Sequence, residues 1–416
     1  MKQKLGELLS VCRTAVGAPA ASHEAPQSAH RKRPDDLQKQ YSGSKSSTKP
    51  SIVVYEPKIH FPLLERLFDQ ASGNASLGNR SFVNWYYGSS KERCCLLLAM
   101  QGDELVGTIG AEAVEFETNT GERFRVGFGQ NFFSFVPGVG ARLFFHASKV
   151  FGGGVSFGAA PASQHIVKRR RWVEFGDVYE WSINPLSYSE QIEPGWKAAA
   201  RALRARLLRV DLRTLASQAA AAGFSPCEVR RLSEYPVGIS PDQTEFSWRF
   251  RPSLEHLRWR YPLQDGPLRY RAYQVERAGE RLGFVILSWR PGQVIAAHVD
   301  VVRRADYVPA VVHSIAAWVE ENVEERYASV RFSLQQGSED ALLLQTGFRK
   351  SSKPTFFAVG PQGDGYRVEI PRTGGNFSLG MGDNDLRVPF WEDVLRDRPR
   401  EDQDGGEVEV PVAVLR

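Results

Sequence analysis

One order of secondary-structure patterns occurs twice along this chain, and the repetition limits the folds that the chain can adopt. Three strand-like runs separated by short turns fill residues 94–136, and three more fill residues 268–302. In each half, a segment with apolar residues at helical spacing follows, and after it come a further strand and a short helix. The repeated order predicts two domains of one plan in tandem, even without residue identity between the halves.

The first half opens with a β-branched run at 51–54, and the leucines of the next segment, 61–70, fall on one helical face. After Pro137, apolar residues recur at helical spacing, and the glycine-rich segment 152–161 returns to a strand pattern. Residues 163–171 are compatible with a short helix, and the strand-forming residues of 172–186 close the domain.

The second half predicts a helix at 253–261, then the three strands and a long helix with Asp306 as its N-cap and Pro309 in its first turn. Between the halves, residues 194–222 form an amphipathic helical pattern with many arginines. Solvated arginines on a connecting helix are the commoner outcome, and contact with nucleic acid or an acidic partner is the alternative.

Composition sets the outer boundaries of the folded part. Residues 18–50 are rich in Ser, Lys, Arg, Gln, Pro and Ala and contain almost no large apolar residue, so burial cannot offset the entropy of ordering them. The predicted division is a disordered tail at 1–50, a first domain at 51–190, a helical connector at 191–235, a second domain at 236–385 and a C-terminal tail at 386–416.

The cysteines and the charge indicate a cytoplasmic protein without a metal site. Cys12, Cys94, Cys95 and Cys227 have no zinc-site or disulfide spacing, which fits a reduced compartment. No apolar stretch approaches the roughly 20 residues that a membrane span needs, and the N-terminus is a poor secretory signal. The net charge of +5 does not call for nucleic acid or an anionic membrane.

Phrases from both halves, taken in order, resemble the GNAT superfamily of N-acyltransferases. The first half supplies ELVGTIG, NFFSFVPGVGARLF and SQHIVKRRRW, and the second supplies GERLGFVIL, VIAAHVDVV and LLLQTGF. The phrase FSLGMGDNDL is similar to the segment after the second domain in tandem-GNAT proteins associated with bacterial polysaccharide biosynthesis. The resemblance implies an α/β fold of two tandem GNAT-like domains, each a mixed, mostly antiparallel twisted sheet flanked by helices.

In this family a loop at the start of a helix binds the pyrophosphate of acyl-CoA through backbone N–H groups, and glycine allows the close approach. The residues at this place are Val136, Gly138, Val139, Gly140, Ala141 and Arg142. The resemblance also implies that a backbone N–H near Val136 is a donor to the oxyanion. A plain tight turn is the alternative. The second half has Arg303 to Asp306 here without a glycine, so we expect no acyl-CoA there.

The family often has a carboxylate on the fourth strand and a tyrosine on the helix after the fifth, whereas this chain has Gln130 and Asn131 on that strand. His165, near the tyrosine position, is one candidate catalytic group, with a surface or capping role as its alternative. Asp300, at the end of the second half's fourth strand, is the other, and its alternative role is to cap that strand beside Arg303 and Arg304.

The leading hypothesis is an N-acyltransferase that moves an acyl group, most simply acetyl, from acyl-CoA to the amine of a small molecule or amino sugar, within polysaccharide assembly. The aromatic run Trp85, Tyr86 and Tyr87 lines an acceptor pocket for a sugar or anchors the core. The alternatives are a catalytically degenerate scaffold and a Fem-like transferase that uses aminoacyl-tRNA or acyl carrier protein. Nucleic-acid binding ranks last, and the sequence leaves acceptor and oligomeric state open.

Overall fold

The structure is a computed structural model, and it describes most residues between 49 and 360. The described ranges are 49–70, 77–88, 93–159, 161–169, 172–184, 209–264, 269–290, 292–360 and 375–376. Residues 1–48 of the expected N-terminal tail, the expected C-terminal tail and most of the expected connector helix lie outside these ranges, as does the phrase FSLGMGDNDL.

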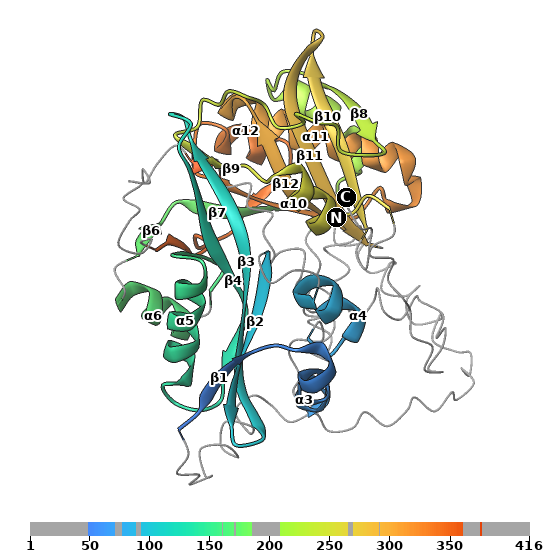
Figure 1. Ribbon diagram of the computed structural model, residues 1–416. Helices are drawn as coiled ribbons and strands as arrows, with labels where there is room; N and C mark the ends of the chain where they lie inside the picture. The colour runs from blue at the N-terminus through green and yellow to red at the C-terminus, as the bar shows by residue number, and fades with distance from the viewer. Residues whose placement is uncertain are drawn as a thin grey trace, which may run out of the picture.

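Two mixed β-sheets flanked by helices form the described part of the chain, which confirms the predicted fold class (Figure 1). The first sheet follows the order β1-β2-β3-β4-β5-β15-β6, and β9 and β16 extend it beside β3. The bounds are β1 Ser51–Val54, β2 Cys94–Gln101, β3 Glu104–Thr118, β4 Arg123–Ser134, β5 Gly154–Phe157, β15 Phe357–Val359, β6 Val173–Phe175, β9 Trp248–Phe250 and β16 Gly375–Asn376.

Strands β1 to β4 form the predicted antiparallel meander, and β5 runs parallel to β4. The β3–β4 hairpin turns at Gly121, whose φ of 83° lies in the left-handed region that favours glycine. Side chains alternate across β2, so Cys94 and Cys95 are buried on opposite faces of the sheet. Both thiols therefore belong to the core.

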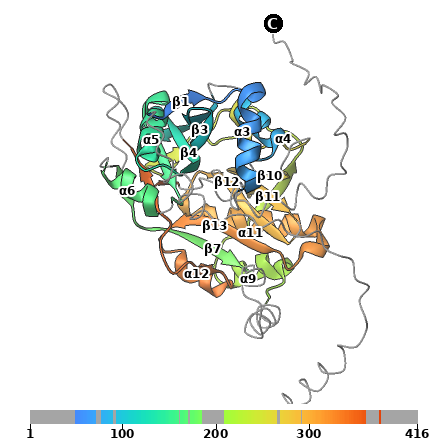
Figure 2. The same ribbon diagram turned by 90° about the horizontal axis from the view of Figure 1, so that it is seen from below.

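Helices cover both faces of the first sheet (Figures 1 and 2). On one face lie α3 (Pro57–Gln70), α4 (Arg80–Val83) and the π-helical turn η1 (Asn84–Gly88), and on the other lie α5 (Val139–Val150) and α6 (Pro161–Arg169). The apolar face of α5 buries Leu143 and Phe144 against the sheet, as the helical spacing predicts.

The second sheet follows the order β14-β7-β13-β12-β11-β10-β8. Its strands are β14 Arg349–Lys350, β7 Val178–Ile183, β13 Ser329–Gln335, β12 Gln293–Val301, β11 Glu280–Arg290, β10 Tyr270–Arg277 and β8 Glu228–Leu232. Its helices are α9 Leu215–Ala221, α10 Leu254–Arg260, α11 Arg304–Glu321 and α12 Asp340–Gln345, with single turns η2 Leu212–Thr214 and η3 Val323–Glu325. None of the helices in the described ranges is both long and apolar enough to cross a membrane.

Each half contributes strands to the sheet of the other half. The closing segment expected at 172–186 forms two strands, and the second of these, β7, pairs with β13 of the second sheet. In return β15, from the end of the second half, lies between β5 and β6 of the first sheet. The sheets therefore have matching strand orders, but each is completed by the other half. The division of the chain into separate domains remains a prediction.

The expectation that Asp306 caps α11 is wrong. The N-cap residue is Arg303, without a side-chain cap, and Asp306 lies inside the first turn. Its carboxylate accepts from Arg277 Nη1 at 2.7 Å and from Arg303 Nε at 2.7 Å. An acid in the first turn is still favourable, because it faces the positive end of the helix dipole. With Asp306 held by the two arginines, the helix begins about one turn earlier than the pattern predicts.

Candidate functional site

The parallel strands β4 and β5 diverge after a short paired stretch. They pair at Gly127↔Gly154 and Phe128↔Val155, and β4 then continues to Ser134. Beyond this point β5 pairs with β15 on its other side. Within the described residues, β4 beyond Phe128 consequently has no strand partner on the edge that faces β5.

A β-bulge lies on the unpaired part of β4. The β3–β4 register changes from Gly110↔Gln130 to Thr108↔Phe133, so two residues of β4 oppose one residue of β3. The extra residue is Asn131, whose φ of 48° is left-handed and uncommon outside glycine. Bulges bend a strand and redirect its backbone groups, and they occur often beside active sites.

Side chains from two other elements hold the bulge in place. Thr108 Oγ1 donates to the Asn131 carbonyl at 2.8 Å, and Asn131 Nδ2 donates to the Tyr87 hydroxyl at 2.6 Å. Tyr87 reaches the bulge across β3 at Gly110, where a Cβ would lie 2.1 Å from the hydroxyl oxygen. Gly110 is thus needed for Tyr87 to contact the bulge.

The predicted loop lies where β4 passes into α5. Gly138 occupies the N-cap with a φ of 80°, and no side chain caps the helix. The N–H of Arg142 donates to the Gly138 carbonyl at 3.3 Å, whereas no acceptor for the N–H groups of Gly140 and Ala141 is found among the described residues. The first turn therefore offers donors to an outside acceptor.

This helix start suits an anion. Unsatisfied N–H groups and the helix dipole together favour negative charge at the N-terminus. A Cβ added at Gly138 would meet nothing within 4 Å, so the space before the helix is open. A Cβ at Gly140 would lie 3.2 Å from Phe132 Cζ, so there the loop packs closely against β4. The residues present therefore fit a bound diphosphate.

The matching place in the second half is taken up by the chain's own charges. Arg304, the first residue of α11, lies 3.3 Å from Glu339 and donates to the Gln335 carbonyl at 2.6 Å. The carboxylate of Asp306 already lies in the first turn. The absence of acyl-CoA from this half stays a prediction.

A buried polar cluster lies beside the bulge, centred on the carboxylate of Glu112 in β3. Tyr86 donates its hydroxyl to Glu112, and Gln130 Nε2 donates to Glu112 Oε2 at 3.0 Å. Two side chains of α10 complete the cluster: His256 Nε2 lies 3.1 Å from Glu112 Oε1, and Arg260 Nε lies 3.5 Å from Oε2. Both halves of the chain contribute to it.

Glu112 is an ionised carboxylate in this setting. Glu112 is 2% exposed, and burial alone would raise the pKa of its carboxyl group. The contact with His256, the charge of Arg260 and the hydroxyl of Tyr86 outweigh burial and lower the pKa of Glu112 to about 2. A carboxylate of such low pKa is a weak base near neutral pH, and its role is to hold its partners.

The sequence of the fourth strand gives no sign of a carboxylate near the bulge, because Gln130 and Asn131 stand there. Glu112 comes from β3, inside a run of fully or nearly buried residues. A charged residue within such a run is a signal by itself, because buried charges are almost always paired. Tyr86 and Tyr87 are buried as well, and Tyr86 stacks on Trp259, so this aromatic run contributes to the core.

The two predicted catalytic residues lie apart from this cluster. His165 is exposed on α6, beside the first sheet, and Asp300 belongs to β12 of the second sheet (Figure 1). Asp300 is fully buried, and its Oδ1 lies 3.2 Å from Arg249 Nη1. Burial raises the pKa of Asp300, and the charge of Arg249 offsets part of that rise.

The ion pair that Asp300 makes is thus with Arg249 of β9 rather than with the arginines that follow it in the chain. These contacts fit a structural pair between β9 and β12. No group of histidine, cysteine and acidic residues that could hold a metal ion occurs in the described ranges.

No family model matches the sequence, and no curated protein matches it. Solved structures do match. A GCN5-related N-acetyltransferase from Anabaena variabilis is 10% identical, with 74% of this chain and 72% of that chain covered and a TM-score of 0.46. Saccharomyces cerevisiae N-myristoyltransferase with bound myristoyl-CoA and inhibitors is 12% identical, with 90% and 97% covered and a TM-score of 0.45.

A third match is a tandem GNAT protein from the clavulanic acid biosynthesis pathway. It is 11% identical, with 75% of this chain and 97% of that chain covered and a TM-score of 0.42. Acyltransferases with GNAT folds, one of them tandem, are therefore among the solved structures that this chain is similar to, as the resemblance in its sequence indicates. These likenesses concern the fold alone.

Proposed function

We propose that this chain is an N-acyltransferase that takes an acyl group from acyl-CoA and passes it to an amine. The observation that carries the proposal is the combination found along one strand: a bulge at Asn131, an edge that β5 has left, and the uncapped start of α5 at Gly138. A thioester donor with a diphosphate at one end needs each of these features.

Each feature has a distinct task. The free N–H groups of Gly140 and Ala141 are donors for a diphosphate. The unpaired edge of β4 offers backbone hydrogen bonds to an extended chain, as an exposed strand edge does. The bulge turns backbone groups away from the ladder, and a preorganised N–H there would stabilise an oxyanion. Gln130, next to the bulge, is held by Glu112 and Tyr86.

Thermal melting with acetyl-CoA and with coenzyme A tests the binding step. A ligand that binds only the native state stabilises it by about 3 kcal/mol at a hundredfold excess over its Kd, so the melting temperature should rise. Gly138→Val should abolish the rise, because a β-branched residue is strained at a φ of 80°.

Gly121→Val is the matched control, since Gly121 has a φ of 83° and equally open surroundings in a distant turn. Both variants should lose similar stability without ligand, and only the Gly121 variant should keep the shift. A ligand shift that survives in Gly138→Val would show that the diphosphate does not bind at α5. No shift with acyl-CoA of any chain length in the parent protein would refute acyl-CoA binding.

A binding module without catalysis is the second candidate. Its support is that Glu112, Gln130 and Tyr86 are 2%, 3% and 0% exposed, so the polar groups next to the bulge are closed to solvent. Release of free thiol from acyl-CoA in the presence of a panel of primary amines separates the two functions. Thiol release that depends on the amine supports the transferase, and ligand binding without release supports the module. An acetyl donor and an amino-sugar acceptor from polysaccharide assembly are the finer expectations.

A further inference from the structure

In the proposed transfer, the two ends of the donor determine the direction of its acyl group. The diphosphate lies at the start of α5 and the thioester at the bulge, which places the donor along the free edge of β4. An extended donor therefore carries its acyl group past the bulge and away from α5, to the stretch where β4 and β5 pair at Gly127 and Phe128. The side chains around this stretch decide which acyl groups fit.

One face of this stretch of β4 is filled by side chains. Phe128 is fully buried and packs in one core cluster with Val155 of β5. Gln130 lies on the same face, because side chains alternate along a strand. It is 3% exposed and donates to Glu112 and to the Tyr86 hydroxyl. An acyl group on this face would have to displace buried side chains.

The opposite face has room beside Gly129. This glycine is partly exposed, and among the described residues a Cβ added to it would meet only the Val155 carbonyl oxygen, at 3.9 Å. The φ of Gly129 lies outside the left-handed region, so backbone conformation does not account for a glycine here. A glycine inside a strand often marks a place where a ligand or another backbone approaches closely.

Two aromatic rings end this room where β4 and β5 pair. A Cβ at Gly127 would lie 2.7 Å from the Phe151 ring, and a Cβ at Gly154 would overlap the Trp172 ring. Gly127 and Gly154 are paired neighbours, so the two rings cover adjacent positions of the sheet. Gly127 and Gly129 lie on the same face, roughly 7 Å apart along the strand. The room is therefore short.

Glycines from both halves of the chain allow Trp172 to lie on the sheet. A Cβ at Gly360 would overlap the Trp172 ring, as one at Gly154 would. The Gly360 N–H donates to the Gly154 carbonyl at 2.7 Å, and Gly360 directly follows β15, which comes from the second half. From the helix side, the ring of Phe144 in α5 packs against Trp172 with the ring centroids 5.0 Å apart.

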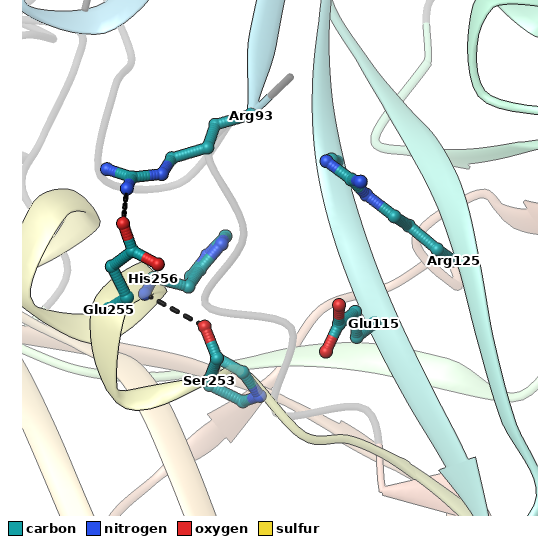
Figure 3. Close-up of a pocket in the computed structure, with 8 residues that line it drawn as sticks. Arg93, Glu115, Arg125, Ser253, Glu255 and His256 are labelled. Atoms are coloured by element: carbon teal, nitrogen blue, oxygen red, sulfur yellow. Dashed lines mark hydrogen bonds and ion pairs between the residues drawn. The ribbon is translucent and has the colours of Figure 1, made fainter. Parts of the chain in front are cut away.

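The lining of the room is apolar, unlike that of the cavity shown in Figure 3. That cavity, of about 220 Å³ at the start of α10, is lined by charged side chains, and Arg93 and Glu255 form an ion pair in its wall. An acyl chain there would cover charges without offering them a partner, which is costly. Against the rings of Phe151 and Trp172, burial of an acyl chain is favourable.

We propose that the room beside Gly129 binds the acyl group of the donor, and that Phe151 and Trp172 limit this group to short chains, acetyl to butanoyl. Gly129 and Trp172 are then specificity-determining residues, one by leaving space and the other by ending it. The assignment rests on the proposed function and narrows its donor to short-chain acyl-CoA.

Calorimetric titration of the full chain with coenzyme A, acetyl-CoA, butanoyl-CoA and octanoyl-CoA tests the assignment. The three acyl-CoA probes differ only in the length of the acyl group. Acetyl-CoA and butanoyl-CoA should bind at least as tightly as coenzyme A. Octanoyl-CoA should bind at least tenfold more weakly than butanoyl-CoA, because its longer chain meets the two rings.

Trp172→Ala should raise the affinity for octanoyl-CoA about tenfold, because it removes the ring that ends the room. Gly129→Val should lower the affinity for butanoyl-CoA about tenfold, because its side chain fills the room. Coenzyme A should bind both variants as it binds the parent chain. Trp289→Ala is the matched control, since Trp289 is another partly buried tryptophan, in β11 of the second sheet, and its loss should leave all four affinities unchanged.

The assignment is overturned if octanoyl-CoA and butanoyl-CoA bind the parent chain equally, or if Trp172→Ala and Trp289→Ala show the same ratio of the two affinities. Gly129→Val removes no core side chain, so an unchanged affinity for butanoyl-CoA in this variant overturns the assignment even where Trp172→Ala fails to fold. If coenzyme A binds but these ratios do not change, only the acyl site is refuted. If no coenzyme binds the parent chain, the proposed function is refuted with it.

Discussion

Glu112 shows how one buried charge can organise residues that are far apart in the sequence. Its partners are Tyr86, Gln130, His256 and Arg260, from three further elements. A buried carboxylate is costly unless it is paired and hydrogen-bonded, and here the contacts of Glu112 together connect the region of the bulge to α10. Removing the charge should therefore affect both stability and its dependence on pH.

The pKa of Glu112 predicts a specific pH dependence. The pKa falls from an ordinary 4.5 to about 2 in the folded chain, so the ionised form stabilises the fold by about 3 kcal/mol. That contribution is complete above pH 4.5 and is lost as the pH falls towards 2. In Glu112→Gln, unfolding free energies measured between pH 6 and pH 3 should fall less steeply than in the parent chain.

The control for this measurement is Glu104→Gln, an exposed carboxylate at the start of the same strand. It should retain the parent slope. If Glu112→Gln and Glu104→Gln have the same slope as the parent chain, Glu112 is not held at a low pKa.

At the scale of elements, the helix and strand ends carry the site. β4 passes from a paired strand through a bulge to a helix start, and each change coincides with a residue suited to it: Asn131 in the left-handed region and Gly138 at the N-cap. β15 closes the same sheet on the other side of β5, which fixes β5 away from the end of β4.

Phe357 is the residue through which β15 should stabilise this sheet. It is fully buried, and its ring lies 6.0 Å from that of Trp248 at an interplanar angle of 8°. Phe357→Ala should cost about 3–5 kcal/mol, because it removes a large core side chain and leaves a cavity. Denaturant unfolding measures the loss. Leu344→Ala, at a residue 57% exposed on α12, should change stability by less than about 0.5 kcal/mol.

At the scale of the whole molecule, the two sheets are joined by strands that cross between the halves and by a buried ion network around Arg249. Arg249 of β9 is fully buried and lies 3.2 Å from both Glu117 of β3 and Asp300 of β12. Since β7 and β15 also cross between the halves, we expect the sheets to unfold together.

Arg249→Ala tests the joining of the sheets. It leaves Asp300 buried without its cation, which typically costs about 3–5 kcal/mol. Hydrogen exchange should speed up in both sheets, in β4 as well as in β11. Arg123→Ala is the control: Arg123 lies 3.5 Å from the same Glu117, but its side chain is 60% exposed, so its loss should change little. Faster exchange confined to one sheet would contradict the joint unfolding.

Local patterns in the sequence predict much of the fold. Period and turn residues place β1 to β5, β10 to β13 and the helices α3, α5, α10 and α11 within a few residues of their observed bounds. The loop at Gly138 follows from the same local pattern. Asp306 misleads as an N-cap because Arg277, which comes from another strand, contributes to where the helix begins.

The sequence by itself determined the order of strands and helices, since these depend on neighbours a few residues apart. Only the tertiary structure decided which edges pair, and so placed β7 in the second sheet, β15 in the first, and His256 beside Glu112. The physical reason is that the entropy of closing a loop changes slowly with its length, so the available edges and burial, rather than distance along the chain, select the partner.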